Sequence, residues 1–160
     1  MKKVTVVGVG YVGLVTAACL ADIGHRVIGV DIDKDKIEAL KKGVIPIYEP
    51  GLEEIVKRNY SKNLNFEIEV AKAVVQSEVI FIAVGTPSLS DGSVNLDYVK
   101  SAAESIGRSM NGYKVIVNKS TVPSGTGDVV ADIIKKYFKG EFEVVSNPEF
   151  LREGSAVYDF

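Results

Sequence analysis

Three glycines near the amino terminus have the spacing of a phosphate-binding turn. Gly8, Gly10 and Gly13 come directly after a short apolar run, and a longer apolar stretch follows them. In such a segment the first glycine permits a tight turn, the second lets the backbone approach a pyrophosphate, and the third lets a helix pack closely against a strand. The free N–H groups at the start of that helix attract an anion. The segment therefore predicts a dinucleotide site.

An acidic residue stands where the ribose of a dinucleotide would lie. Asp31 follows a second apolar run, residues 26–30, and comes about 20 residues after the glycines. A carboxylate at this point accepts hydrogen bonds from free ribose hydroxyls and repels a 2′-phosphate, so NAD is expected rather than NADP. A glycine triplet alone also occurs by chance in turns. Here, however, the strand, the helix and the acid all fall where the binding mechanism requires them.

Apolar runs alternate with helical patterns along the whole chain. The expected strands are residues 4–7, 26–30, 64–68, 79–84, 114–117 and 142–145. The expected helices are residues 14–23, 34–42, 52–59, 70–76, 96–110 and 125–138. Two prolines and a glycine make 44–51 a loop, and the continuous apolar run 79–84 suits a strand buried on both faces. The alternation predicts an α/β, Rossmann-like doubly wound fold, a mainly parallel sheet with helices on both faces.

Glycines and polar residues follow most of the expected strands at the point where each strand ends. Because the carboxyl ends of parallel strands share one edge of a sheet, and ligands bind in the crevice outside that edge, we expect these segments to converge on one cleft. The segments are 8–10, Asp31, 85–87, 118–123 and 147–149.

Each of the later segments also has a purely structural explanation. The pair 86–87 could do no more than end a strand. The hydroxyl side chains in 120–124 precede an expected helix and could cap it. Glu149 and Glu153 could be solvated surface acids, although the Asn-Pro pair before Glu149, at a strand end, favours a role in the site.

Composition and charge argue against several classes of partner. The chain has 160 residues, 46% apolar and 25% charged, with a net charge of −2, which suits one domain with a substantial core. We expect no nucleic acid partner, because no basic surface is indicated, and no membrane contact, because no stretch is long enough to cross a bilayer. The single cysteine, Cys19, excludes an internal disulfide, fits a reducing cytoplasm, and lies among apolar residues of an expected helix. No cluster of ligating residues suggests a metal.

Five motifs together resemble those of the nucleotide-sugar dehydrogenases, which oxidise a UDP- or GDP-sugar at C6. They occur in the family order and extend over nearly the whole chain, so the combination is far more specific than the glycine turn alone. The motifs are residues 8–14, 46–52, 84–87, 120–126 and 147–154.

The resemblance implies a reaction and a role for particular residues. The family reaction is a four-electron oxidation of a primary alcohol to a carboxylate with two NAD+, and UDP-glucose is the expected substrate. Thr121 and Glu149 are implied to organise water and proton transfer, because hydrolysis of an acyl intermediate needs a positioned base. The residues implied to contact the sugar nucleotide are Glu149, Phe150, Leu151, Arg152 and Glu153. Those expected at NAD are Gly8, Gly10, Tyr11, Val12, Gly13, Asp31, Lys36, Thr86, Thr121 and Glu153.

The chain departs from the family pattern in length. Family members continue into a central helix and a second domain, which supply a nucleophilic cysteine, an oxyanion-stabilising lysine and most of the sugar-nucleotide site. Thioester chemistry needs a thiolate facing the nicotinamide, and Cys19 lies in the wrong element. We therefore expect residues 1–160 to be the NAD-binding domain, able to bind NAD but without turnover alone. For the full-length enzyme the resemblance implies a homodimer in the cytoplasm.

Two alternatives remain open at this stage. The same cofactor half could serve a dehydrogenase of GDP-mannose or of a UDP-aminosugar, because base and sugar are chosen largely by residues outside this chain. Tyr48 favours UDP-glucose. A stand-alone nucleotide-sensing module would share the glycine turn and the acid, but residues 46–52 and 147–154 have no purpose in such a sensor.

Overall fold

One six-stranded sheet runs through the protein, whose computed structural model describes residues 1–160. All neighbouring strands are parallel, in the order β3-β2-β1-β4-β5-β6. The predicted doubly wound α/β fold is confirmed, and the strand order reverses between β1 and β4. The strands are β1 (Lys3–Val7), β2 (Arg26–Val30), β3 (Leu64–Glu67), β4 (Val79–Ile82), β5 (Val115–Asn118) and β6 (Glu143–Ser146).

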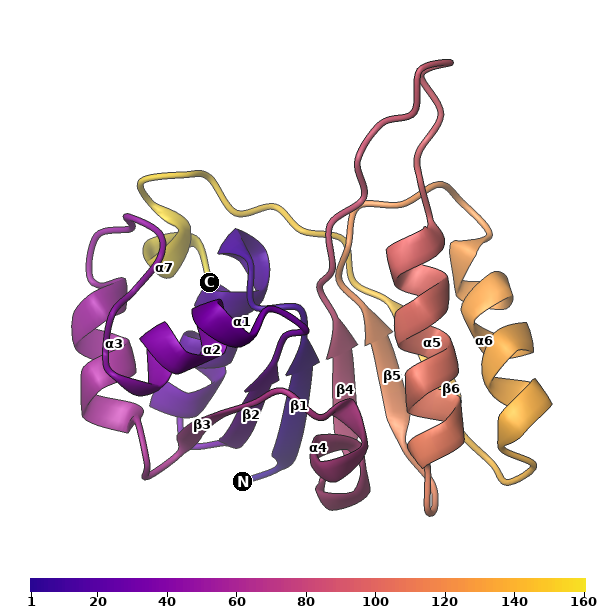
Figure 1. The fold of residues 1–160 in the computed structure, drawn as a ribbon, viewed down its shortest axis with the longest axis horizontal. Helices are drawn as coiled ribbons and strands as arrows, with labels where there is room; N and C mark the ends of the chain where they lie inside the picture. Colours follow the sequence, from indigo (N-terminus) through magenta and orange to yellow (C-terminus); the bar gives the residue numbers. More distant parts are fainter.

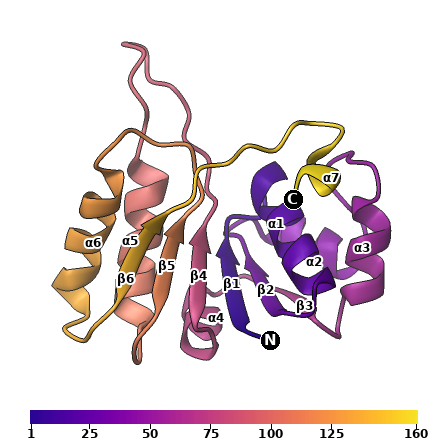
Figure 2. The same cartoon turned by 180° about the vertical axis from the view of Figure 1, so that it is seen from behind.

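Helices cover both faces of the sheet, as Figure 1 shows. α1, α3 and the short α7 lie over β1 to β3, whereas α4, α5 and α6 lie on the opposite face. In Figure 2, β5 and β6 stand in front of α5 and α6, and no helix covers this half of the front face. The helices are α1 (Tyr11–Asp22), α2 (Lys34–Lys41), α3 (Leu52–Asn59), α4 (Val70–Gln76), α5 (Asp97–Ser109), α6 (Thr126–Tyr137) and α7 (Ala156–Asp159).

Three element boundaries differ informatively from the predicted ones. α1 begins at Tyr11 rather than at residue 14, because the last residues of the glycine motif already form its first turn. β4 ends at Ile82 rather than at residue 84. The Ala83 N–H still donates to the Val7 carbonyl at 2.8 Å, and the chain then leaves the sheet. α7 was not predicted, since its four residues are too few to show a helical pattern.

The expectation that β4 is buried on both faces was half right. Ile80 and Ile82 are fully buried beneath α5 and α6, but Val79 and Phe81, which face the other way, are only half-buried. The physical reason is the uncovered half of the front face seen in Figure 2. A continuous apolar run therefore indicates that a strand lies in the middle of the sheet. It does not show that helices cover both faces of that strand.

Two apolar cores, one on each face, hold the helices to the sheet. Leu14 of α1 and Leu52 of α3 pack with Phe66 of β3 in the first core. Ile106 of α5 packs with Ile116 of β5 in the second. Each of these side chains is almost completely buried, which contributes about 1.5–3 kcal/mol per residue to folding. The cores fix the ends of the strands relative to one another, and the candidate site depends on those ends.

The closest backbone approach in the glycine turn is at Gly13. A Cβ atom at Gly13 would lie 1.8 Å from the carbonyl oxygen of Gly8 and 3.3 Å from the Cβ of Ala83. α1 therefore packs against the end of β1 at a distance that only glycine allows. Gly10 is different, because a Cβ atom there would have no heavy atom within 4 Å.

We predict that Gly13→Ala destabilises the domain, although alanine is normally the better helix former. The backbone clash with Gly8 should cost about 3 kcal/mol, the upper part of the range for overpacking, which lowers the melting temperature by about 6 °C or more. Gly10→Ala is the matched control and should melt close to the wild type. Thermal unfolding followed by circular dichroism measures both melting temperatures. Equal values for the two variants would contradict the conclusion that the close packing of α1 requires glycine at position 13.

Candidate functional site

A continuous cleft lies at the carboxyl ends of β1 and β4, where the strand order reverses. It consists of two neighbouring cavities, of about 270 Å³ and about 230 Å³. Both cavities are lined by Gly10 and by residues 83–85, which come from the two adjacent strand ends. The crevice outside such a reversal point is where open parallel sheets bind ligands. We call the larger cavity the Asp31 cavity and the smaller one the Glu149 cavity, after acids that line them.

The glycine turn lines both cavities, through Gly10 in each and through Gly8 in the Asp31 cavity. Gly8 has a φ angle of +92°, and its N–H donates to the Val30 carbonyl at 2.8 Å. Gly10 is the N-cap of α1 and supplies no side chain to cap it. The first N–H groups of α1 therefore have neither an intrahelical acceptor nor a capping side chain. This arrangement fits the phosphates of a dinucleotide, because an anion can approach the helix start without meeting a side chain.

Asp31 and Lys36 form an ion pair in the Asp31 cavity, with 2.9 Å between Lys36 Nζ and Asp31 Oδ2. The backbone N–H groups of Val9 and Asp33 also donate to the Asp31 carboxylate, each at 3.1 Å. Burial alone raises the pKa of Asp31, but these hydrogen bonds outweigh it and lower the pKa overall. The carboxylate is therefore ionised at neutral pH and can accept hydrogen bonds from ribose hydroxyls.

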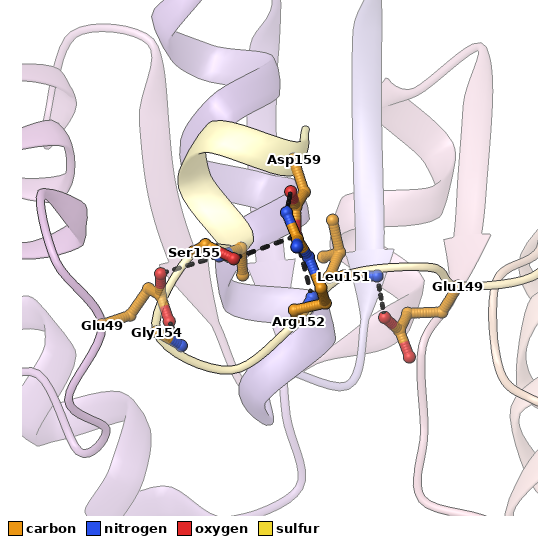
Figure 3. A network of polar contacts seen from close by, with 8 residues as sticks. Glu49, Glu149, Leu151, Arg152, Gly154, Ser155 and Asp159 are labelled. Carbon is orange, nitrogen blue, oxygen red and sulfur yellow. Dashed lines mark hydrogen bonds and ion pairs between the residues drawn. The ribbon is translucent and has the colours of Figure 1, made fainter.

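The Glu149 cavity brings together the residues predicted at the chemical end of the site. Thr86, Thr121 and Glu149 all line it. The Thr86 hydroxyl donates to the Thr121 carbonyl at 3.0 Å, which ties the segment after β4 to the segment after β5. A Glu149 carboxylate oxygen accepts from the backbone N–H of Leu151, as Figure 3 shows. Four residues predicted at NAD also line the two cavities, namely Gly8, Tyr11, Val12 and Lys36.

The helix-capping explanation for residues 120–124 is wrong. The N-cap of α6 is Gly125, with a φ angle of +84° and no capping side chain. The Ser120 hydroxyl instead donates to the Val84 carbonyl at 2.8 Å, and so fixes the wall of the Glu149 cavity. Thr121 faces the same cavity.

The residues predicted to contact the sugar nucleotide lie outside both cavities, except Glu149. Phe150 is 83% exposed, and Glu153 is exposed as well. Leu151 packs against the first apolar core. Arg152 forms an ion pair with Asp159, with 2.6 Å between Nη2 and Oδ1, as drawn in Figure 3. Substrate contacts by this segment therefore stay predictions.

Lys119 belongs to the segment 118–123, which was predicted to converge on the cleft, but the sequence assigned it no role of its own. It lies in the Glu149 cavity; it is buried, and burial lowers the pKa of its ammonium group. The residues of α5 that line the cleft were missed in the sequence. One face of α5 lines the Asp31 cavity. Its residues are three or four positions apart, the spacing that places side chains on the same face of a helix, and this spacing could have identified them. These α5 residues are Tyr98, Ser101, Ala102 and Ser105.

Tyr11 and Glu49 are joined by a hydrogen bond beside the Glu149 cavity. The Tyr11 hydroxyl donates to the Glu49 carboxylate. Burial of the phenol, the hydrogen bond and the negative charge of Glu49 together raise the pKa of Tyr11 to about 12. Burial alone raises the pKa of Glu49, but the hydrogen bonds from Tyr11 and from the N–H groups of Gly154 and Ala156 lower it overall.

The lone thiol has no place in this site. Cys19 is buried in α1, outside both cavities, and burial followed by the charge of Asp22 raises its pKa to about 11. It therefore packs as a small apolar residue. No group of three or more His, Cys, Asp or Glu side chains is arranged to hold a metal ion. None of the helices combines the length and the apolar character that a membrane span requires.

The fold and the cleft together define a dinucleotide-binding domain of the Rossmann type. The UDP-glucose/GDP-mannose dehydrogenase family, NAD binding domain, matches residues 2–160. The chain therefore belongs to the UDP-glucose/GDP-mannose dehydrogenase family, as its NAD-binding domain.

Individual relatives agree with this assignment. The chain is 56% identical to the UDP-glucose 6-dehydrogenase TuaD of Bacillus subtilis (strain 168), over 99% of this chain and 35% of TuaD. A UDP-glucose dehydrogenase structure from Pyrobaculum islandicum has a TM-score of 0.96 and 45% identity, covering 100% of this chain and 38% of that one. A GDP-mannose dehydrogenase from Pseudomonas aeruginosa, in a ternary complex, has a TM-score of 0.93 and 39% identity, covering 98% and 38%. The chain thus spans little more than a third of their length.

We predict that Asp31→Ala weakens NAD binding by about 10- to 100-fold, because a hydrogen bond to a charged acceptor contributes about 1.5–3 kcal/mol. The substitution also leaves Lys36 without its partner, which favours a 2′-phosphate, so the ratio of NAD to NADP affinity should fall. Calorimetric titration with both dinucleotides measures this. Asp35→Ala, on the exposed first turn of α2, is the control, and an unaltered affinity ratio for Asp31→Ala would contradict the ribose contact.

Tyr11 makes stability depend on pH in the alkaline range. Its pKa rises from 10.0 to about 12 on folding, so the unfolded phenol ionises first. The contribution of Tyr11 to stability is complete below pH 10 and is lost as the pH rises to about 12. The free energy of unfolding of the wild type should therefore fall towards that of Tyr11→Phe across this interval. Urea titrations of both proteins test this, and a constant difference between them would refute it.

Proposed function

We propose that this chain is the cofactor half of a UDP-glucose 6-dehydrogenase, which converts UDP-glucose to UDP-glucuronate with two NAD+. The observation that carries the proposal is the single cleft that connects Asp31 to Glu149 at the reversal of strand order. The 56% identity to the UDP-glucose 6-dehydrogenase TuaD supports the choice of sugar nucleotide. We also propose a homodimer in the cytoplasm for the whole enzyme, by analogy with the family.

Different residues of the cleft bind different parts of NAD, which accepts a hydride when bound. The N–H groups at the start of α1 hold the pyrophosphate, and Gly10 leaves room for it. The Asp31 carboxylate accepts from the ribose of the adenosine half, with Lys36 fixing its orientation. Thr86 and the Glu149 cavity, which adjoins the glycine turn, would receive the nicotinamide end, where the hydride is accepted.

Glu149 and Thr121 act on the substrate side of that cavity. The Glu149 carboxylate accepts a proton from the water that attacks the acyl carbon, and Thr121 helps to position that water. Lys119 lines the same cavity; burial lowers the pKa of its ammonium group, and the negative charge of Glu149 partly offsets that effect. The thiolate nucleophile and most contacts to the sugar nucleotide come from residues beyond these 160, because Cys19 is buried away from the cleft.

The second candidate is a dehydrogenase of GDP-mannose or of a UDP-aminosugar. It is favoured by the TM-score of 0.93 with the GDP-mannose dehydrogenase from Pseudomonas aeruginosa. The preference for UDP-glucose that Tyr48 indicates in the sequence stays a prediction, since Tyr48 is 89% exposed and lines neither cavity of the cleft. A nucleotide-sensing module has less support, because residues 46–52 and 147–154 belong to the family pattern and contact each other through Glu49.

The proposal predicts that the 160-residue chain binds NAD but does not turn over UDP-glucose. Gly10→Val should weaken NAD binding by about tenfold or more, because its side chain occupies the approach to the pyrophosphate, while leaving the melting temperature nearly unchanged. Calorimetry with NAD and NADH formation measured at 340 nm provide the two readouts.

Two results would count against the proposal. Undiminished NAD affinity in Gly10→Val would refute the assigned pyrophosphate site. NADH formation from UDP-glucose by the isolated chain would refute the dependence on a thiolate from elsewhere. With the full-length enzyme, a comparison of UDP-glucose, GDP-mannose and UDP-aminosugars identifies the substrate.

A further inference from the structure

The loop 44–51 contains a buried carboxylate that the proposed function leaves without a role. Glu49 is only 5% exposed, although Tyr48 beside it is 89% exposed. A buried carboxylate is costly unless several donors satisfy it. The contacts of Glu49 therefore indicate what this loop does.

Glu49 accepts hydrogen bonds from two distant parts of the chain. Its Oε1 accepts from the N–H of Ala156 at 2.8 Å, and its Oε2 accepts from the N–H of Gly154 at 2.8 Å. Oε2 also accepts from the Tyr11 hydroxyl. Figure 3 shows the Glu49 carboxylate facing the chain at Gly154. One side chain thus joins the first turn of α1 to the carboxyl-terminal segment.

The carboxyl-terminal segment has no comparable polar anchor elsewhere. Beyond Asn147, its hydrogen bonds to the rest of the protein all end on Glu49. The ion pair between Arg152 and Asp159 lies within the segment and does not attach it to the body. In Figures 1 and 2 the segment crosses the carboxyl edge of the sheet from β6 to α7. Glu49 therefore holds the far end of that crossing.

The Tyr11 hydroxyl connects this anchor to the cofactor turn. Tyr11 follows Gly10 directly and lines the Glu149 cavity together with Glu149. A ligand on the turn would therefore lie one residue from a side chain whose hydroxyl donates to Glu49. Glu49 in turn accepts from the segment in which the proposed substrate residues lie.

We propose that Glu49 is a positioning residue that holds residues 147–155 against the glycine turn, so that NAD binding and the ordering of the sugar-nucleotide segment are coupled. This inference rests on the proposed function, which assigns NAD to the turn and the sugar nucleotide to residues 149–153. It gives the motif 46–52 a physical purpose, namely to deliver one carboxylate between two binding segments.

Glu49→Gln tests the anchor with almost no change in volume. A carboxamide has only one oxygen, so it cannot accept from both Gly154 and Ala156, which use different oxygens of Glu49. At least one of these two amides should exchange its hydrogen about tenfold faster than in the wild type. Exchange is measured for each residue by NMR, and the amides of β1 and β4 report whether the fold is intact.

Glu53→Gln is the matched control. It makes the same chemical change on α3, where Glu53 is exposed and pairs with Lys57. Exchange at Gly154 and Ala156 should stay at the wild-type rate in this variant. Wild-type exchange at both amides in Glu49→Gln would overturn the proposal, and so would equal acceleration in the two variants.

Tyr11→Phe tests the coupling and leaves the Glu49 anchor in place. In the wild type, saturating NAD should slow exchange at Gly154 and Ala156 by about fivefold or more, the lower end of the range for coupled sites. In Tyr11→Phe, with NAD raised until calorimetry shows that this variant is saturated, the slowing should disappear. Full retention of the slowing would overturn the coupling, even if Glu49→Gln failed to fold.

A failure of the proposed function can be distinguished from a failure of the Glu49 anchor. If the wild-type chain does not bind NAD in calorimetry, the cofactor assignment and the coupling both fail. Exchange in Glu49→Gln without NAD then still decides whether Glu49 anchors the segment.

Discussion

The structure depends on one close backbone approach, between the carbonyl of Gly8 and the first turn of α1 at Gly13. This contact sets how near α1 lies to the end of β1. It consequently decides where the free N–H groups of the helix point and where Tyr11 meets Glu49. A side chain at Gly13 would separate the helix from the strand, and with it the cofactor turn from the loop 44–51.

A second constraint is the reversal of strand order between β1 and β4. Chains that leave these two strands turn to opposite faces of the sheet, so a crevice opens between them. Asp31 and Glu149, which are far apart in sequence, border the two cavities of that one crevice. The two apolar cores hold the strand ends in place, and hydrogen bonds from Thr86 and Ser120 fix the walls of the cleft.

The same domain occurs in relatives named for different sugar nucleotides. UDP-glucose dehydrogenase from Pyrobaculum islandicum and GDP-mannose dehydrogenase from Pseudomonas aeruginosa superimpose on it with TM-scores of 0.96 and 0.93. A scaffold this similar suits a shared cofactor better than a particular sugar. The exposed positions of Phe150 and Glu153 agree with that view, since neither is enclosed by this domain.

Local patterns in the sequence were sufficient for all the elements of the fold except α7, and for the cofactor turn. Strands, helices and the glycine motif depend on neighbours within a few residues, and the parallel sheet follows from their alternation. The convergence of Asp31, Thr86, Thr121 and Glu149 on one cleft also followed, because parallel strands share an edge.

Only the tertiary structure decided how the remaining polar residues are used. The burial of Glu49 and Lys119, the α5 wall of the Asp31 cavity and the rejection of helix capping by 120–124 depend on contacts between distant segments. The exposure of Phe150 has the same origin. A charged or apolar side chain looks the same in sequence whether it is buried or exposed, because desolvation and partners arise only when the chain is packed.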